Sequence, residues 1–256
     1  MRFTQVGGEH EPYSSAREAS GLLQLVALLT AIYDDEVGVL LIDEPEVSLY
    51  PQLQAFLLRE MHRVAGDPEE EKKKLIVIAT HSTEMVDLRK ASDLPSLVFC
   101  YDVTENPKQI SADAGELRSR KVKSLIARMS QEHKLTFFCQ RPILLEGPSD
   151  EIVASGLSRI FNLYLEAAGA QPLPVIGKGQ MPVVTKLMRL IGKSPVVIAD
   201  ADAVADGLDL IGAYAGEPTV NVEAQAHGFP NISRFARSIH SDFCQLSTTI
   251  GWISKM

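Results

Sequence analysis

The chain has 256 residues, 45% of them hydrophobic and 23% charged, a balance that suits one large or two modest folded domains rather than general disorder. No apolar stretch approaches the roughly 18 residues of a membrane span, and the N-terminus lacks the basic and apolar regions of a secretory signal, so we expect a cytoplasmic protein without a membrane partner. The net charge of −8 argues against a protein that holds nucleic acid by bulk positive charge.

The first part of the chain alternates between helical and strand patterns. The expected elements are a helix from Ala16 to Tyr33, a strand at 37–43, a helix from Pro51, a strand at 75–81 and a strand at 96–103. Ser14 or Ser15 would cap the first helix. The strands at 37–43 and 75–81 are continuous apolar runs, which predicts parallel strands that are buried on both faces.

The pattern begins again near residue 142. The expected elements are a strand at 142–147, a helix capped by Ser149, a strand at 173–177, a helix around 183–191 and a strand at 194–200. This alternation predicts a parallel α/β sheet with right-handed crossovers. Further on, residues 206–216 look helical and residues 219–225 favour a strand, while the last 25 residues support no prediction.

Basic side chains concentrate between the two blocks. Residues 111–140 contain 6 Lys or Arg against 3 Asp or Glu, whereas both flanking blocks are acidic. The central basic residues are Arg118, Arg120, Lys121 and Lys123. A solvated helix face and a DNA contact both explain such a run.

The cysteines indicate a reducing environment. Cys100, Cys139 and Cys244 are far apart and odd in number. This usage predicts buried, reduced thiols rather than a disulfide framework or a zinc site.

An acidic pair follows the strand at 37–43, and a histidine follows the strand at 75–81. Of Asp43 and Glu44, one carboxylate can hold Mg²⁺ while the other orients or deprotonates a water, as nucleotide hydrolysis requires. LLIDEPEVSLYP followed by LIVIATHS resembles the Walker B and switch-histidine region of ABC-type ATPases, in the branch related to DNA repair and phage-exclusion ATPases. The resemblance implies that Asp43 supports the magnesium, Glu44 polarises the attacking water and His81 contacts the terminal phosphate. It also implies that Glu46 to Pro51 form the loop that meets a second ATPase subunit.

Two features depart from that family. Its signature helix would begin at Glu18, and Ala19 stands where a phosphate-contacting serine is usual. Ser20 and Gly21 are then the candidates for nucleotide contact. The sequence also contains no GxxxxGK[ST] motif, whose amides and lysine grip the β and γ phosphates. The matching part therefore resembles the C-terminal half of an ABC ATPase, and we expect ATP to bind only in a composite site.

Four carboxylates follow the strands at 142–147 and 194–200. They are Glu146, Asp150, Asp200 and Asp202. Because parallel strands end at one edge of a sheet, these side chains can converge on a site that divalent cations would occupy. Oxygen ligands of this kind select Mg²⁺ or Mn²⁺ over zinc, and two such ions roughly 4 Å apart can drive phosphodiester hydrolysis. The alternative is that each acid caps a helix or faces solvent.

The EGxSD and DAD strings resemble the Toprim domain of topoisomerases, primases and nucleases of the OLD family (overcoming lysogenization defect). Lys178, in VIGKGQ, falls where OLD-family proteins often have a glycine- and lysine-containing turn. It would reach a phosphate or, alternatively, be a plain loop lysine. Glu151 and Glu223 are weaker candidates for metal contact, and Lys255 is left unassigned.

An ABC ATPase half joined to a Toprim domain is the architecture of the OLD nucleases, and the resemblance runs from about Ala16 to Asp209. It implies an α/β fold with a partial ABC-ATPase (P-loop NTPase-like) sheet in residues 1–110, a basic connector in 111–140 and a parallel Toprim domain in 141–256. The leading hypothesis is an Mg²⁺- or Mn²⁺-dependent DNA endonuclease. The metals, Lys178 and the connector would hold the DNA.

Two other hypotheses remain open. The chain could be an ATP-binding regulatory or interaction subunit that completes an ATPase site with a P-loop-bearing partner. It could also be an inactive remnant of a longer ATPase-nuclease, which an exposed edge on the first sheet would favour. A homodimer is implied by the family architecture alone.

Overall fold

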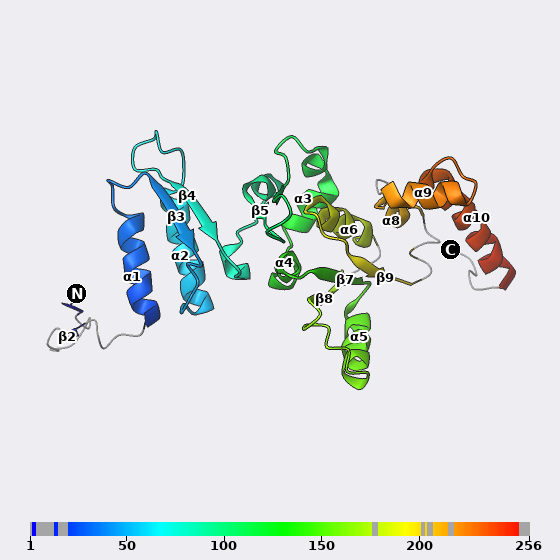
Figure 1. Cartoon of the computed structure of the whole chain (residues 1–256), viewed down its shortest axis with the longest axis horizontal. Helices are drawn as coiled ribbons and strands as arrows, with labels where there is room; N and C mark the ends of the chain where they lie inside the picture. Colours follow the sequence, from blue (N-terminus) through cyan, green and yellow to red (C-terminus); the bar gives the residue numbers. More distant parts are fainter. Residues whose placement is uncertain are drawn as a thin grey trace. The chain divides into compact units, whose positions relative to one another are not determined.

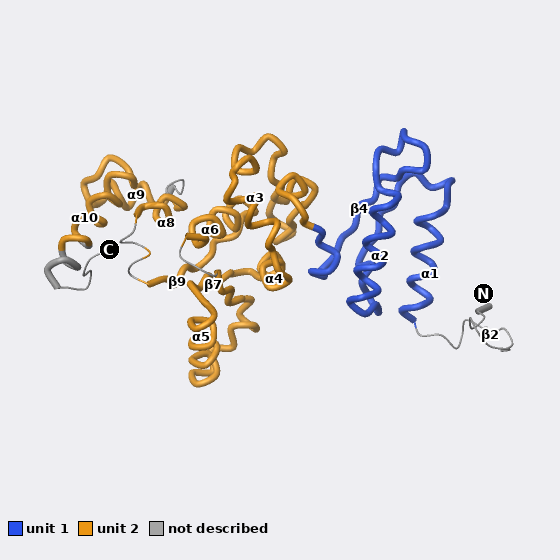
Figure 2. The backbone as a smooth tube through the Cα atoms, turned by 180° about the vertical axis from the view of Figure 1, so that it is seen from behind, with its two compact units in different colours: residues 1–87 blue, residues 88–256 orange. Residues whose placement is uncertain are grey.

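The computed structural model describes residues 2–3, 13–14, 20–175, 179–200, 203, 207–214 and 218–250. The chain divides into two compact units, residues 1–87 and residues 88–256 (Figure 2). Segment 88–140 belongs to the second unit, whereas the sequence suggested domain limits at 110 and 140. Among the described helices, none has the length and hydrophobicity that crossing a membrane requires.

The first unit is built around a two-stranded parallel sheet. Its elements are β1 (Arg2–Phe3), β2 (Tyr13–Ser14), α1 (Ser20–Ile32), β3 (Val39–Asp43), α2 (Pro51–Val64), β4 (Leu75–Ala79) and the short 3₁₀ helix η2 (Thr83–Met85). β1 and β2 pair antiparallel, and β3 and β4 run parallel (Figure 1). α2 begins with Pro51 as predicted, because the first helical position needs no amide hydrogen. The predicted cap Ser14 lies in β2 instead, and Ser15 lies outside the described residues.

Only one face of the β3–β4 sheet is covered within the described part of this unit. The core of α1 and α2 packs on alternate strand residues, namely Leu40, Ile42, Ile76 and Ile78. The remaining apolar strand residues are exposed, namely Val39, Leu41, Leu75 and Val77. The prediction that these strands are buried on both faces was therefore wrong, because successive side chains of a strand point to opposite faces and both helices lie on the same one.

The second unit contains a three-stranded parallel sheet in the order β8-β7-β9. Its elements are the 3₁₀ helices η3 (Ala91–Ser96) and η4 (Gly115–Arg118), the strands β5 (Val98–Phe99), β6 (Lys108–Gln109), β7 (Arg141–Leu145), β8 (Ala170–Pro174) and β9 (Val196–Ile198), and the helices α3 (Arg120–Ile126), α4 (Gln131–Phe138), α5 (Pro148–Ile160), α6 (Met181–Leu190), α8 (Asp209–Gly212), α9 (Pro218–Ala226) and α10 (Ile232–Ile250). The strand-helix alternation confirms the predicted parallel α/β arrangement (Figure 1). Leu144 and Leu173 in the sheet and Leu187 on α6 are fully buried, so the central strand belongs to the core of this unit.

Several predicted elements of the second unit differ from the structure. The strand expected at 96–103 is only β5, and it pairs antiparallel with β6 outside the parallel sheet. The strand favoured at 219–225 is helix α9, which buries Ala224 and exposes Val222, so the local alternation of apolar residues was misleading. α5 is capped by Gly147 rather than Ser149. The unassigned C-terminal region contains α10.

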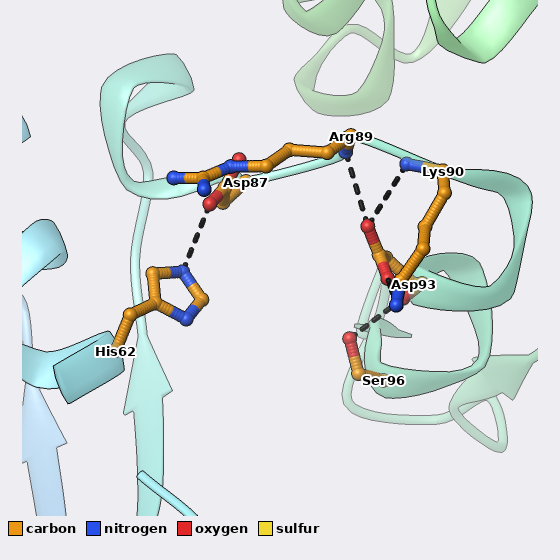
Figure 3. Close-up of polar contacts among 6 residues, drawn as sticks. All are labelled: His62, Asp87, Arg89, Lys90, Asp93 and Ser96. Atoms are coloured by element: carbon orange, nitrogen blue, oxygen red, sulfur yellow. Dashed lines mark hydrogen bonds and ion pairs between the residues drawn. The ribbon is translucent and has the colours of Figure 1, made fainter. Parts of the chain in front are cut away.

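The backbone next to the unit boundary is held within each unit (Figure 3). In the first unit, His62 Nε2 of α2 lies 2.9 Å from Oδ2 of Asp87, the last residue of that unit. In the second, Asp93 Oδ2 accepts hydrogen bonds from the backbone N–H groups of Arg89 (3.1 Å) and Lys90 (3.0 Å). Each unit therefore fixes its own side of the junction.

None of the three cysteines forms a disulfide. Cys139 and Cys244 are partly buried, but Cys100 is exposed, so the expected burial was wrong for Cys100. The buried Lys193 donates a hydrogen bond to the carbonyl of Cys139, and its Nζ lies 4.1 Å from the centre of the Tyr101 ring. Burial lowers the pKa of Lys193. Lys193 is therefore a structural residue of the core of the second unit.

Candidate functional site

The carboxyl ends of β3 and β4 bring the first set of predicted residues to one edge. Asp43 ends β3 and pairs in register with Ala79, the last residue of β4. Glu44 and His81 follow at the same edge, where the N–H of Glu44 donates to the carbonyl of Ala79 over 2.9 Å. His81 Nε2 lies 3.7 Å from Glu44 Oε1. Strand register therefore gathers residues that are far apart in the sequence.

Glu44 has an unusual backbone conformation for a glutamate. Its φ of 47° lies in the left-handed region, which costs a residue with a side chain about 1–3 kcal/mol. The side chains of Glu44 and His81 are 49% and 83% exposed. A carboxylate and an imidazole that face solvent in this way can orient a water and contact a phosphate.

Glu46 links the loop after β3 to the loop after β4. Its Oε1 accepts a hydrogen bond from Thr80 Oγ1 at 2.7 Å and another from the backbone N–H of His81 at 2.8 Å. Oε2 of the same carboxylate is buried without a hydrogen-bond partner in the described structure. The sequence assigned Glu46 to a subunit-contacting loop and missed this internal bridge, because the register of two strands cannot be read from one segment.

The start of α1 lies against the loop that follows β3. A Cβ on Gly21 would lie 2.0 Å from the carbonyl oxygen of Ser48, so this approach requires glycine. Gln24 Nε2 donates to the carbonyl of Pro45 over 3.4 Å in the same region. Gly21 is thus used in packing within its own unit, whereas Ser20 is exposed. Nucleotide contact by these two residues stays a prediction.

The second set of predicted residues lies at the carboxyl edge of β7 and β9. Leu145 of β7 pairs with Ile198 of β9, so Glu146 and Asp200 emerge side by side. Glu146 Oε2 accepts a hydrogen bond from the backbone N–H of Asp200 at 3.1 Å. Asp150, in the first turn of α5, accepts from the N–H of Gly147 through Oδ2 at 2.9 Å. These contacts join the two strand ends and the helix that follows β7.

The metal ligation expected at this edge remains a prediction. No group of three His, Cys, Asp or Glu side chains within the described residues is arranged to hold a metal ion. Asp202, Lys178 and Lys255 lie outside the described residues. Of the weaker candidates, Glu151 is on α5, and Glu223 is on α9 rather than on a strand.

The basic connector forms an amphipathic surface on α3 and η4. Val122, Leu125 and Ile126 of α3 are buried. The basic side chains on the other side are exposed, namely Arg118, Arg120, Lys121 and Lys123. Lys121 Nζ lies 3.5 Å from Asp209 Oδ2. This exposed face concentrates positive charge on an otherwise acidic chain, which fits both a solvated helix face and a DNA contact.

Comparison with known families gives one match within each unit. Residues 4–87 match the family described as AAA domain, putative AbiEii toxin, Type IV TA system. Residues 137–202 match the family described as overcoming lysogenization defect protein-like, TOPRIM domain. The first match ends at the last residue of the first unit, and the second spans β7 to β9 with their carboxyl edge. No curated protein matches the chain.

Proposed function

Because the chain joins an AAA-type ATPase-like domain to an OLD-like Toprim domain, the architecture of the OLD family, we propose that it is a metal-dependent DNA endonuclease. The two domains indicate a nuclease-type function, and the Toprim domain indicates an enzyme of the hydrolase type that acts on nucleic acid. The hydrogen bond from the backbone N–H of Asp200 to the Glu146 carboxylate carries the proposal, since it brings two acidic residues together at the strand edge of that domain.

The acidic side chains at this edge suit a hard divalent cation. Glu146 and Asp200 offer carboxylate oxygens from adjacent strand ends, and Asp150 uses only Oδ2 in its hydrogen bond to Gly147. A donor set of oxygens favours Mg²⁺ or Mn²⁺ over zinc. Such an ion would supply Lewis acidity for the attack of water on a phosphodiester. Asp202 would complete the set, and Lys178 would contact a phosphate.

The protein's own contribution would be to hold these carboxylates in place. Glu146 is half-buried and accepts the Asp200 amide, so it restrains the start of the loop after β9. Asp150 is restrained by its capping contact at the start of α5. Asp200 is exposed and so can meet a ligand from solvent. Preorganised carboxylates reduce the reorganisation needed when a phosphodiester binds.

A plasmid nicking assay with Mg²⁺ or Mn²⁺ tests the proposal. We expect Asp200→Ala to lower nicking at least about a hundredfold, because loss of a group that stabilises the transition state typically costs 10²–10³ in rate. Asp242→Ala is the matched control, since Asp242 is an exposed aspartate on helix α10 rather than at a strand end. Equal nicking by wild type and Asp200→Ala would reject the assignment, and nicking absent even from wild type would favour an inactive remnant.

The basic surface of α3 and η4 would hold the DNA backbone. Each phosphate contact that is lost lowers the slope of log affinity against log salt by about one. We expect the double variant Arg120→Ala/Lys123→Ala to lower this slope by about two, while Lys72→Ala/Lys73→Ala in the first unit leaves it unchanged. An unchanged slope in the α3 variant would exclude this surface from the DNA interface.

A second candidate is an ATPase site that is completed by a P-loop-bearing partner. The observation that favours it is the exposed apolar face of the β3–β4 sheet, where Leu41 is 76% exposed. An inactive remnant would expose the same face, so the two hypotheses differ in whether a P-loop segment restores nucleotide binding. Apolar patches of this kind commonly mark interfaces, and the edges of a two-stranded sheet can accept further strands. A segment that supplies a strand, the phosphate-gripping loop and the helix after it would extend the sheet at its edge and cover this face next to Glu44 and His81.

Nucleotide binding separates the second candidate from the first. Binding of a fluorescent ATP analogue with Mg²⁺ is measured for the chain alone and with an OLD-family P-loop segment supplied in trans. We expect binding only in the mixture, and its loss in Leu41→Glu but not in Val103→Glu, another exposed apolar site. ATP hydrolysis by the chain alone that Glu44→Gln abolishes would contradict the need for a partner.

A further inference from the structure

The structure contains a closed hydrogen-bond circuit between the two loops of the ATPase-like edge. It starts at Glu46, whose Oε1 accepts from Thr80 Oγ1 and from the N–H of His81. The N–H of Ser82 donates to Thr80 Oγ1 over 3.0 Å, and Ser82 Oγ donates to Gln54 Oε1 of α2 over 2.6 Å. Gln54 Nε2 donates to the carbonyl of Leu49, at 2.9 Å, which returns the circuit to the loop of Glu46. Both loops are therefore tied to each other and to one helix.

The position of the His81 side chain depends on these hydrogen bonds, because packing contributes less restraint to it than to a buried side chain. Its side chain is 83% exposed, so little packing restrains the imidazole. The backbone of His81 is restrained at the edge by its N–H bond to Glu46. Because the imidazole lies 3.7 Å from Glu44 Oε1, a shift of the backbone would change the spacing of these two groups directly.

The choice of a carboxylate at position 46 has an energetic cost. Oε2 is buried and has no hydrogen-bond partner within the described residues, which is unfavourable for a polar atom. Its compensation is that Oε1 is a charged acceptor, and hydrogen bonds to charged acceptors are stronger than neutral ones. The unfavourable burial of Oε2 therefore falls on the one side chain that links the loops after β3 and β4. Such a buried polar contact is expected where a site must keep a defined geometry.

We propose that Glu46 is a positioning residue, which fixes His81 opposite Glu44 through the backbone of the loop after β4. The inference rests on the proposed nucleotide role of Glu44 and His81 and deepens it. Glu46 would act through His81 and would not touch the nucleotide. Thr80, Ser82 and Gln54 would carry the restraint to α2.

Nuclear magnetic resonance of the whole chain, with labelled histidine and backbone nitrogen, tests this role without nucleotide or DNA. We expect Glu46→Ala to speed hydrogen exchange of the His81 amide by at least about tenfold, since a bond to a charged acceptor is lost. The His81 imidazole signals should shift as well. The amide of Leu57, a fully buried residue of the same unit, should change by less than about threefold, because the core remains folded.

Two further variants make the test specific. Glu46→Gln keeps an acceptor oxygen, so it should retain most of the His81 protection and the imidazole signals. Glu69→Ala removes an exposed carboxylate of the same unit and should change neither. Unchanged His81 exchange in Glu46→Ala would overturn the proposal, as would equal acceleration of the His81 and Leu57 amides. Failure of DNA nicking or ATP binding would leave these readouts unaffected, so the proposals fail separately.

Discussion

The two units place acidic residues in the same way but cover their sheets differently. In both, candidate residues lie at the carboxyl edge of paired parallel strands, with Asp43 and Glu44 at the end of β3 in the first unit and Glu146 and Asp200 after β7 and β9 in the second. In the first, the described structure covers one face of the sheet, whereas in the second the central strand β7 is buried and the edge strand β9 exposes Val196 and Ile198. Pairing of two parallel strands is thus enough to bring residues together at their carboxyl ends, whereas burial of the strand side chains requires helices packed on the sheet.

Truncating one leucine in each sheet tests this difference with the largest expected effect. Leu144→Ala, at a fully buried position of β7, should destabilise the second unit by about 2–5 kcal/mol. Leu41→Ala, on the exposed face of β3, should cost less than about 0.5 kcal/mol. Urea unfolding followed by hydrogen exchange on peptides of each unit gives both values. Equal losses would mean that the face of Leu41 is covered in solution.

Replacing each of two glycines by alanine tests how closely α1 packs against the loop after β3 in the first unit. Gly21→Ala should cost about 1–3 kcal/mol, because its Cβ would meet the carbonyl oxygen of Ser48 at 2.0 Å. Gly38→Ala is the matched control, since a Cβ there meets no atom within 4 Å. Exchange of peptides from the first unit reports the change. A tolerated Gly21→Ala would show that α1 does not press on this loop.

Magnesium should distinguish the two edges, because only the second is proposed to hold a metal without a partner. At a Mg²⁺ concentration ten times Kd, binding to the folded state stabilises it by about 1.4 kcal/mol. We expect this gain in exchange protection for the second unit alone, its reversal by a chelator, and its absence in Asp200→Ala. An equal gain in protection from hydrogen exchange in the first unit would contradict the proposal that only the second unit binds Mg²⁺ without a partner.

The smallest expected effect is a pH dependence in the second unit, at α4. Burial lowers the pKa of His133 below its ordinary value of 6.5, and its Nδ1 accepts from the Ser130 N–H at 3.4 Å. The folded state then binds fewer protons than the unfolded state, so stability present above pH 6.5 is lost as the pH falls through the lowered pKa.

Urea unfolding of the second unit between pH 7 and pH 5 measures this loss. His133→Gln should make the profile flatter, because the titrating ring is gone. A profile that is equally steep in both proteins would assign the acid sensitivity to other groups.

Local patterns predicted much of the edge that carries each site. The apolar runs before Asp43, His81 and Glu146 predicted strands close to their observed positions, because a continuous apolar run is typical of a strand in a parallel sheet. The alternation of apolar residues at 219–225 was misleading, because the segment is helix α9, which buries Ala224. In a short segment, packing against the rest of the protein can override the secondary structure that the local pattern favours.

The sequence by itself determined which residue types end each strand, and through its motifs the order of an ATPase-like domain and a Toprim domain. Only the tertiary structure decided that one oxygen of Glu46 binds both Thr80 and His81 of the loop after β4, that Gly21 meets Ser48, and that one face of β3–β4 is exposed. The physical reason is that each of these depends on strand register or on helix placement. Both are set by contacts between segments far apart in the chain, which no single stretch of sequence encodes.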